Sequence, residues 1–356
     1  MNQLRLAVVG CGHLGTIHAR LLAGRDDVEL VAVVDPVAEA RDRVAAAHGC
    51  RALAEPKDLI GLVDAAVVAA PTGLHAAVVL PLLEGGIDML VEKPLAATPE
   101  DAWAIAVAAR RLGRIVSVGH VERFNPAWRT AAERAGEVRF LEARRLAPFT
   151  FRSLDVGVVH DLMIHDIDLA LSLSPGPLET VEAQGLVATG GHEDAVRARL
   201  VFASGFIAEL SASRISPRAE RTIALWSVGG TVSVDLTTRA VEVIAPSESV
   251  RSGRFTADQV PFAERAGLKE RFFAEILPLE TVHVADANAI ACEHDDLVAA
   301  IRTGTEPLVP ATAGAAAVEV ASRVLEVLEY ARFGGGRPAG RTRPVSIPLF
   351  PHRKTG

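Results

Sequence analysis

The first 120 residues alternate short apolar runs with longer stretches of helical periodicity, and this alternation limits the fold more than any other feature of the sequence. The runs are rich in valine, leucine and isoleucine, as in strands that a parallel sheet buries on both faces. They cover residues 4–9, 28–35, 64–70, 89–92 and 115–119, and the helical stretches cover residues 13–23, 38–48, 56–60, 74–84 and 99–112. This order predicts a doubly wound α/β domain over residues 1–120.

The pattern changes after residue 120, where helices are expected at residues 126–135, 161–173 and 311–333. Short, partly alternating runs separated by Gly, Ser or Pro predict strands of an open, mostly antiparallel sheet. They cover residues 180–186, 195–202, 206–213, 222–227, 230–235 and 240–244. Because 356 residues exceed what one core usually serves, we expect a second, α+β domain over residues 121–345 and a tail over residues 346–356.

Composition and charge exclude several classes of protein. The formal net charge is −7, with acidic and basic residues interleaved, so the chain offers no basic stripe to a nucleic acid. No run of about 18 apolar residues indicates a membrane span, and no signal peptide is evident. The three cysteines have no paired spacing, which favours a reducing compartment. We therefore expect a soluble, cytoplasmic protein that binds neither nucleic acid nor membrane.

The first strand ends in a glycine turn, G-C-G-H-L-G at residues 10–15, which opens the first helix. In a dinucleotide-binding turn, the first glycine allows the tight bend and the second lets backbone N–H groups approach a pyrophosphate. The third lets helix and strand pack closely, and the pyrophosphate lies at the positive end of the helix dipole. The alternative is a plain strand–turn–helix connection. We predict a Rossmann domain whose cofactor is bound by Gly10, Gly12, His13, Leu14 and Gly15.

The second strand ends in Asp35, whose carboxylate could accept hydrogen bonds from the hydroxyls of the adenosine ribose. The charge of this carboxylate would repel a 2′-phosphate, which favours NAD over NADP. Arg41 and Arg43 on the next helix are cationic and would attract a 2′-phosphate, so NADP stays an alternative, although a less favoured one.

A lysine follows the strand at residues 89–92, in the sequence Glu92-Lys93-Pro94. Ligands of open α/β sheets bind just outside the carboxyl ends of the strands. Lys93 could therefore donate to a substrate hydroxyl and help to move a proton. The alternative is a solvated Glu–Lys pair at a strand end.

Ionisable residues recur at one-turn spacing in the helix expected at residues 161–173. One helix face would carry Asp161, His165, Asp168 and Ser172, and such a face is costly to bury unless its groups pair or line a cleft. His165 is our candidate base, because histidine is best suited to accept a proton near neutral pH. Two alternatives remain. The groups could form a polar network that supports the core, or a metal site could form from His160, Asp161, His165 and Asp166, which would leave the glycine turn unexplained.

Taken together, these segments resemble the Gfo/Idh/MocA oxidoreductase family over essentially the whole chain and in the family's order. The glycine turn matches, and the A-P-T-G-L-H string at residues 70–75 is similar to the family's cofactor loop. The E-K-P string resembles the family's signature, whose lysine contacts cofactor and substrate. The resemblance thus adds to the expected cofactor-binding residues Pro71, Thr72, His75, Glu92 and Lys93.

The catalytic roles are implied by the same resemblance, because Asp161 and His165 have the family's D-x-x-x-H spacing. His165 would be the general base that takes the hydroxyl proton as hydride leaves for the nicotinamide C4. Lys93 would orient and polarise that oxygen, and Asp161 would position the substrate. The family's second domain often builds dimers and tetramers, so a homo-oligomer is implied as well.

The substrate is indicated by two further strings. The segment at residues 119–126 contains Arg123 and Asn125, which could hold a phosphate or sugar hydroxyls, although Asn125 could instead cap the helix that follows. E-R-F-N-P and H-D-L-M-I-H-D-I-D-L look most like family members that act on nucleotide-linked sugars, such as UDP-N-acetylglucosamine 3-dehydrogenases. One departure is the single glycine, Gly157, before Asp161, where many members have a pair. Two rivals stay open: a free polyol, inositol or glucose dehydrogenase, and a NAD-binding sensor or scaffold without turnover.

Overall fold

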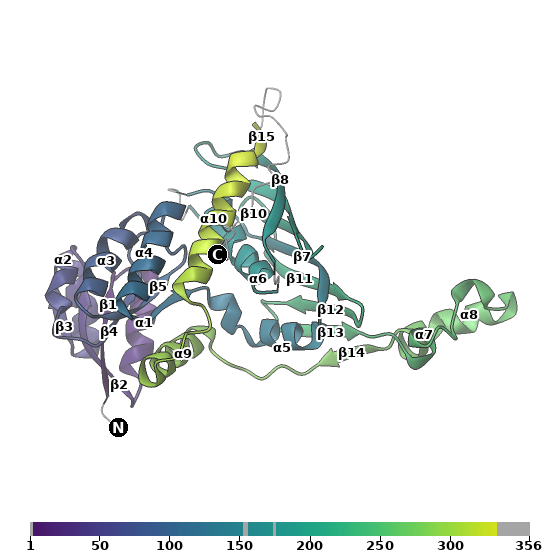
Figure 1. Cartoon of the computed structure of the whole chain (residues 1–356), viewed down its shortest axis with the longest axis horizontal. Helices are drawn as coiled ribbons and strands as arrows, with labels where there is room; N and C mark the ends of the chain where they lie inside the picture. The colour runs from purple at the N-terminus through teal and green to yellow at the C-terminus, as the bar shows by residue number, and fades with distance from the viewer. Residues whose placement is uncertain (1–2, 152–155, 174–175, 333–356) are drawn as a thin grey trace, which may run out of the picture. The chain divides into compact units, whose positions relative to one another are not determined.

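The computed structural model describes residues 3–151, 156–173 and 176–332, which fall into two compact units. Unit 1 consists of Met1–Phe124 and Ala287–Arg323, and unit 2 of Asn125–Asp286 and Val324–Gly356 (Figure 1). The observed boundary at Phe124 lies close to the expected one at residue 120. Residues 287–323, which we expected in the second domain, return to the first. The expected tail at residues 346–356 lies outside the described residues.

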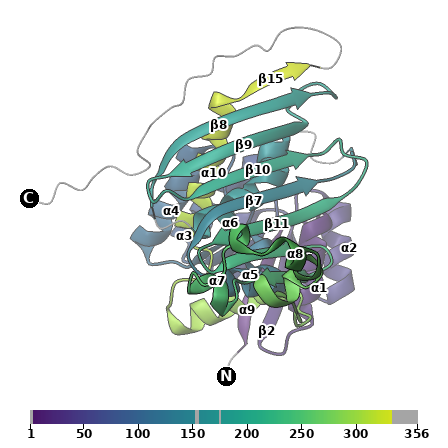
Figure 2. The same ribbon diagram turned by 90° about the vertical axis from the view of Figure 1, so that its right-hand side faces the viewer.

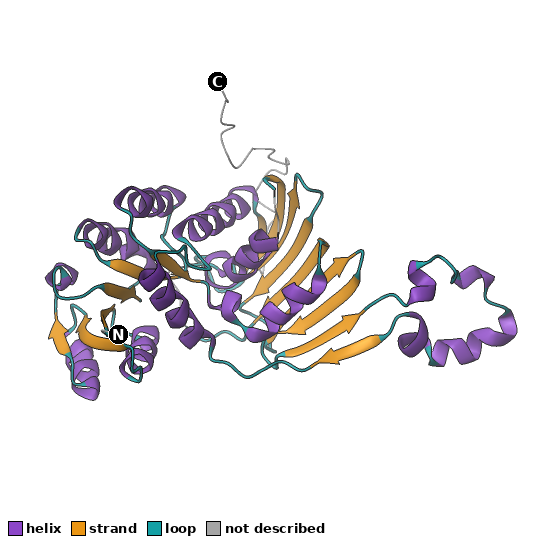
Figure 3. Cartoon of the chain, turned by 60° about the horizontal axis from the view of Figure 1, so that its bottom comes forward, coloured by secondary structure: helices purple, strands orange, loops and turns teal. Residues whose placement is uncertain are grey.

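Unit 1 is the predicted doubly wound α/β domain, with six parallel strands in the order β3-β2-β1-β4-β5-β6 (Figure 3). The strand order reverses between β1 and β4, and ligands of such sheets bind outside the carboxyl ends of the strands at this point. Its elements are β1 (Leu4–Val9), α1 (His13–Ala23), β2 (Val28–Val34), α2 (Ala38–His48), β3 (Arg51–Leu53), η1 (Pro56–Leu59), β4 (Ala65–Val68), η2 (Thr72–Leu74), α3 (His75–Glu84), β5 (Asp88–Glu92), α4 (Pro99–Leu112), β6 (Val116–Gly119), η3 (Val121–Phe124), α9 (Ala289–Thr303) and most of α10 (Ala311–Val327).

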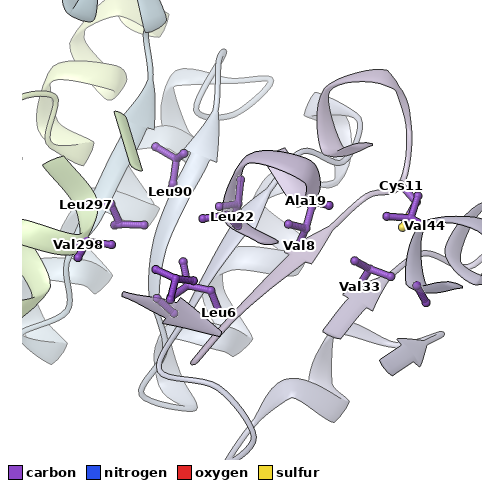
Figure 4. Packing of buried hydrophobic residues seen from close by; sticks show 14 residues of the cluster. Leu6, Val8, Cys11, Ala19, Leu22, Val33, Val44, Leu90, Leu297 and Val298 are labelled. Atoms are coloured by element: carbon purple, nitrogen blue, oxygen red, sulfur yellow. The ribbon is translucent and has the colours of Figure 1, made fainter. Parts of the chain in front are cut away.

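The core of unit 1 explains why α9 belongs to it. Leu6 and Val8 of β1 belong to one buried apolar cluster with Leu22 of α1 and with Leu297 and Val298 of α9 (Figure 4). Burying a leucine or valine side chain stabilises a fold by about 1.5–3 kcal/mol. This apolar contact therefore holds a helix that lies far away in the sequence against the strands that carry the glycine turn.

Several expectations for the helices and strands were wrong or incomplete. The expected helix at residues 56–60 is the 3₁₀ turn η1, and the short strand β3 before it was not expected. Helix α9 was not expected because its buried face includes Glu293 and His294, which interrupt the apolar periodicity. The last helix ends at Val327 and is followed by a strand, instead of continuing to residue 333.

Unit 2 contains a nine-stranded sheet in the order β14-β13-β12-β11-β7-β10-β9-β8-β15, and Figure 2 shows the strands from β15 to β11 side by side. The sheet is mostly antiparallel, as predicted; β7 with β10 and β8 with β15 pair in parallel. Its elements are α5 (Pro126–Ala135), β7 (Val138–Leu146), η4 (Val159–Met163), α6 (Ile164–Leu173), β8 (Leu178–Val187), β9 (Ala195–Phe202), β10 (Ile207–Ser213), β11 (Glu220–Ser227), β12 (Gly230–Asp235), β13 (Ala240–Ile244), α7 (Glu248–Arg251), η5 (Ala257–Gln259), α8 (Phe262–Glu270), η6 (Phe272–Ile276), β14 (Leu279–Val282) and β15 (Glu329–Arg332).

One face of this sheet is buried under α5 and α6, and the residues of each strand alternate between this face and the other. Strand β7 has a central place in the sheet and was not expected. Its buried positions are Val138, Leu141, Ala143 and Arg145, and the charged Arg145 among them conceals the alternation.

Candidate active site

The glycine turn has the geometry that a pyrophosphate requires. Gly10 has φ of +97°, and a Cβ on Gly15 would lie 1.7 Å from the carbonyl oxygen of Gly10, so no other residue fits either position. A Cβ on Gly12 would meet nothing within 4 Å, which leaves the first turn of α1 open to a ligand. No side chain caps this helix end, so its N–H groups are available to an anion. The turn therefore fits a dinucleotide.

A hollow of about 460 Å³ lies at this helix end. It is lined by Gly12, His13, Thr16, Ile17, Arg20 and Arg43. Two arginines and the helix dipole make the hollow suitable for phosphate groups. Leu14 is partly exposed at the same turn.

Asp35 is fixed at the end of β2 by two backbone donors. Its Oδ2 accepts the N–H of Cys11 and its Oδ1 accepts the N–H of Val37, both at 2.8 Å. A carboxylate has further lone pairs, so both oxygens can still accept ribose hydroxyls. Arg41 donates to the carbonyl oxygens of Asp35 and Pro36, and Arg43 is 3.4 Å from that of Cys11.

The loop after β4 contains the expected Pro71, Thr72 and His75. Pro71 is exposed and Thr72 half-buried at the start of η2, but His75 is buried. Its ring nitrogens lie 2.8 Å from the carbonyl oxygen of Ala70 and 3.0 Å from that of Pro94. His75 thus joins the loop after β4 to the loop after β5, and its buried imidazole holds these two loops together.

Lys93 lies half-buried directly after β5, and the peptide bond to Pro94 is cis. The Lys93 N–H donates to Oε2 of Glu92 at 3.2 Å, and Oε1 of Glu92 lies 2.9 Å from Nε2 of His18 on α1. Glu92 is therefore held in the interior of unit 1, while its neighbour Lys93 is half-buried just beyond the end of the strand. The structure thus brings the glycine turn, Asp35, the loop at residues 70–75 and Lys93 to the carboxyl edge of one sheet.

The second group of expected residues lies in unit 2. Asp161 belongs to the π turn η4 and its N–H donates to the carbonyl oxygen of Gly157; His165 lies at the start of α6, and both side chains are half-buried. The predicted single helix face is wrong in detail, because a π turn is wider than an α turn and Asp168 is buried while Ser172 is exposed.

Two buried contacts hold this segment. Arg145 of β7 makes a bidentate ion pair with Asp166, at 2.7 Å between Nη2 and Oδ1, and both side chains are only 3% exposed. A Cβ on Gly157 would lie 1.9 Å from Oε1 of Glu193, so any other residue at this position would need the Glu193 side chain to move. Glu193 in turn accepts the N–H of Val159.

The metal alternative finds no support in these contacts. Within residues 3–151, 156–173 and 176–332, no group of three or more His, Cys, Asp or Glu side chains could hold a metal ion. Asp166, one of the four candidate ligands, is bound by Arg145.

Arg123 and Asn125 fall on either side of the unit boundary. Arg123 is half-buried in η3. Asn125 is the N-cap of α5: its Oδ1 accepts the N–H of Ala127 at 3.0 Å, and its Nδ2 donates to the carbonyl oxygen of Leu236. The capping alternative for Asn125 is therefore observed, as the Asn-Pro sequence indicated.

Sequence reasoning missed His18, Arg145, Glu193 and His294, all of them buried. Each one contacts a residue that lies far away in the sequence, so no local pattern marks it. The only signal was a charged or imidazole side chain at a core position of an otherwise apolar element.

The part of the chain that the structure describes has no helix long and apolar enough to cross a membrane.

Comparisons with known proteins agree with this geometry. The profile of the Gfo/Idh/MocA oxidoreductase family with an NAD-binding Rossmann fold matches residues 4–120, and that of the family's C-terminal domain matches residues 106–233. A UDP-N-acetylglucosamine 3-dehydrogenase of Acidithiobacillus ferrooxidans is 32% identical over 92% of this chain and 98% of its own length. A scyllo-inositol 2-dehydrogenase (NAD(+)) of Bacillus subtilis is 30% identical over 61% of this chain and 69% of its own length.

Solved structures show the same architecture. That of the A. ferrooxidans UDP-N-acetylglucosamine 3-dehydrogenase has a TM-score of 0.80 at 31% identity, covering 91% of this chain and 97% of that one. Scyllo-inositol dehydrogenase from Lactobacillus casei, solved with NAD(H) and scyllo-inositol, shares the fold with a TM-score of 0.71 at 17% identity, covering 92% and 97%.

The fold and the glycine turn define an NAD-binding oxidoreductase that acts on a CH–OH group. The chain belongs to the Gfo/Idh/MocA family.

Proposed function

We propose that this enzyme oxidises the C3 hydroxyl of UDP-N-acetylglucosamine, or of a similar nucleotide sugar, to a ketone with NAD. The observation that carries the proposal is the match to a UDP-N-acetylglucosamine 3-dehydrogenase over 98% of that protein's length, with a TM-score of 0.80. In sequence, the scyllo-inositol 2-dehydrogenase of B. subtilis matches over a smaller share, 61% of this chain. The longer sequence match therefore favours a nucleotide sugar over a free polyol.

The chemistry divides between cofactor and protein. Bound NAD supplies the hydride acceptor. The open turn at Gly12 and the carboxylate of Asp35 would hold its pyrophosphate and its adenosine ribose. When the C–H bond of the carbinol breaks and the carbonyl forms, the hydroxyl must lose its proton, and His165 takes it as the general base.

Lys93 and Asp161 complete the proposed catalytic set. An ammonium that donates to the reacting oxygen stabilises the alkoxide character that develops as the proton leaves. Asp161 positions the substrate hydroxyl, and its backbone is fixed by the hydrogen bond to Gly157. Arg123 would bind a phosphate of the UDP group, because a guanidinium is suited to bidentate phosphate recognition. Asn125 would contribute to substrate binding indirectly, because it caps and so fixes the start of α5.

A substrate panel tests the proposal. The enzyme is mixed with NAD and, in turn, UDP-N-acetylglucosamine, UDP-glucose, free N-acetylglucosamine, glucose, myo-inositol and scyllo-inositol, and NADH is followed by its absorbance. We expect NADH with UDP-N-acetylglucosamine. If free polyols give NADH and UDP-sugars do not, the substrate assignment is wrong; NAD binding without turnover of any member would favour the sensor.

The catalytic assignment needs a variant of the base and a matched control. His165→Ala should lower kcat by about 10²- to 10⁴-fold, the usual contribution of general base catalysis, while the Kd of NAD changes little. The exposed His192 lies in the same unit, and His192→Ala should change neither. Equal losses of kcat and NAD affinity in His165→Ala would indicate a structural role.

We further propose a homo-oligomer, a dimer or tetramer, that forms through the second face of the nine-stranded sheet. Phe140 and Trp226 pack against each other on this face, with ring centroids 5.0 Å apart, and both are only half-buried. Partly exposed aromatic side chains are typical of interfaces. Light scattering should give the mass of an oligomer for the wild type and a lower mass for Trp226→Arg.

The three thiols are free, and we propose a cytoplasmic location.

A further inference from the structure

A chain of buried polar side chains runs from Glu92 into the interior of unit 1. Nε2 of His18 lies 2.9 Å from Oε1 of Glu92, and Nδ1 of His18 lies 2.8 Å from Nε2 of His294. His18 is 0% exposed and His294 1%. The three residues come from α1, β5 and α9, so the chain joins the helix that begins at the glycine turn to the strand that ends at Lys93.

The state of His294 limits the possible directions of these hydrogen bonds. Burial, and to a lesser extent the neighbouring His18 and Arg25, lowers the pKa of His294 to about 3, so this imidazole is neutral near neutral pH. A neutral His294 either donates from Nε2 to Nδ1 of His18 or accepts a hydrogen bond from it, depending on its tautomer. In both arrangements the Nε2–H of His18 donates to Oε1 of Glu92.

The other oxygen of Glu92 is also occupied. Oε2 accepts the backbone N–H of Lys93 at 3.2 Å. A carboxylate accepts at both oxygens, whereas an amide in its place would present an NH₂ group to one of the two donors. A Cβ on Gly119 would lie 3.0 Å from Oε2, so glycine in the neighbouring strand provides the space for this carboxylate.

A second carboxyl group, Glu293, is buried beside this chain. Among the described residues, neither of its oxygens has a hydrogen-bond partner. Burial, and then the negative charges of Glu92 and Asp296, raise the pKa of Glu293 well above its ordinary value. Burial therefore favours the neutral form of Glu293, and Glu92 is the side chain that meets His18 and the Lys93 N–H.

We propose that His294, His18 and Glu92 are positioning residues for Lys93: they fix the Lys93 backbone at the end of β5 and so the place from which its ammonium reaches the substrate oxygen. The inference rests on the proposed function, because it assumes that Lys93 acts on the substrate. The distances carry it, since a displaced catalytic group slows the reaction while the remaining binding contacts persist. A misplacement of about 1 Å can cost on the order of 10²-fold in rate.

Two variants break the chain at different points. Glu92→Gln keeps the shape of the side chain and loses one of its two acceptor contacts. His294→Phe fills the volume and removes the hydrogen bond to His18. We expect both to lower kcat by about 10- to 100-fold with the panel substrate that is turned over, while KM and the Kd of NAD change less than about threefold.

Asp88→Asn is the matched control. Asp88 begins the strand that Glu92 ends, it is buried, and its Oδ1 accepts the N–H of Ile115 at 2.8 Å. Asparagine keeps an oxygen that can accept from Ile115 but loses the charge beside Arg114, so the melting temperature should fall without a change in kcat.

Hydrogen exchange measured by mass spectrometry on the full chain gives a readout apart from activity. The peptide that contains the Lys93 amide should exchange faster in Glu92→Gln and His294→Phe than in the wild type, and should not change in Asp88→Asn. If kcat and exchange in the first two variants equal those of the wild type, or if Asp88→Asn loses as much kcat, the inference is overturned. Should His294→Phe fail to fold, Glu92→Gln alone decides.

Lys93→Ala separates this inference from the proposed function. If Lys93→Ala converts substrate as fast as the wild type, the catalytic assignment of Lys93 fails. Faster exchange in Glu92→Gln would then show only that His294, His18 and Glu92 order the backbone at residue 93. If Lys93→Ala is inactive while Glu92→Gln and His294→Phe are fully active, only the positioning role fails.

Discussion

Replacing Gly12 by alanine should separate the stability of the glycine turn from its function. Gly12 has φ −73° and ψ −161°, which any residue can adopt, and its added Cβ would meet nothing within 4 Å. Alanine lowers the conformational freedom of the unfolded chain, which stabilises a protein by about 0.4–1 kcal/mol. Gly12 is also the N-cap of α1, where alanine is less favourable than glycine, so the two effects oppose each other. We therefore expect Gly12→Ala to melt close to the temperature of the wild type.

The same methyl group should weaken NAD binding. It would occupy the space through which a pyrophosphate approaches the uncapped N–H groups of α1. A hydrogen bond to a charged group contributes about 1.5–3 kcal/mol. If the methyl group prevents one or two of the weaker hydrogen bonds between the backbone N–H groups and the pyrophosphate, binding loses ~2–3 kcal/mol, and the Kd rises by about 30- to 150-fold.

Gly24→Ala provides the control for this prediction. Gly24 lies at the other end of α1 with φ −87°, and the nearest atom to its added Cβ is 3.6 Å away. Calorimetric titration with NAD and thermal unfolding would be measured for both variants. An unchanged Kd in Gly12→Ala would contradict the placement of the pyrophosphate, and a large loss of stability would contradict the backbone argument.

Three further predictions follow from other contacts. Asp35→Ser should shift the ratio of the Kd values for NAD and NADP toward NADP by about tenfold, ~1.4 kcal/mol, because the repulsive carboxylate is lost; titration with both cofactors measures it, and an unchanged ratio would contradict the assignment of Asp35. Arg145→Met should destabilise unit 2 by about 3–5 kcal/mol in urea unfolding, because Asp166 is left as a buried, unpaired charge, and the double variant with Asp166→Leu should recover most of it. Glu293→Gln should remove a pH dependence. The folded-state pKa of Glu293 is raised by burial, so its contribution to stability is full below the unfolded-state pKa and is lost as the pH rises through the folded-state value. The wild type should thus lose stability relative to Glu293→Gln as the pH rises, and parallel melting curves at all pH values would refute the buried neutral acid.

Residues at strand ends could be predicted from the sequence. Asp35 and Lys93 each follow an apolar strand, and parallel strands bring their carboxyl ends to one edge, so their placement needed only the order of the elements. Asn125 was also within reach, since its place before Pro126 gave the capping alternative that the structure shows.

Buried polar contacts could not be predicted in the same way. His18 and His294 meet across 276 residues, and the helix that carries His294 has no regular apolar face. Arg145 occupies a core position of β7, so the strand lacked the alternation that reveals its neighbours. The π turn that contains Asp161 was equally hidden, because its sequence is that of an ordinary helix.

The most direct test of the account follows the hydrogen itself. UDP-N-acetylglucosamine that carries deuterium only at C3 is incubated with the enzyme and NAD, and the reduced cofactor and the sugar product are analysed by mass spectrometry. We predict deuterium in the reduced cofactor, a ketone at C3 of the product, and loss of both in His165→Ala. Reduced cofactor without deuterium, or deuterium retained in the sugar while NADH forms, would contradict hydride transfer from this carbon.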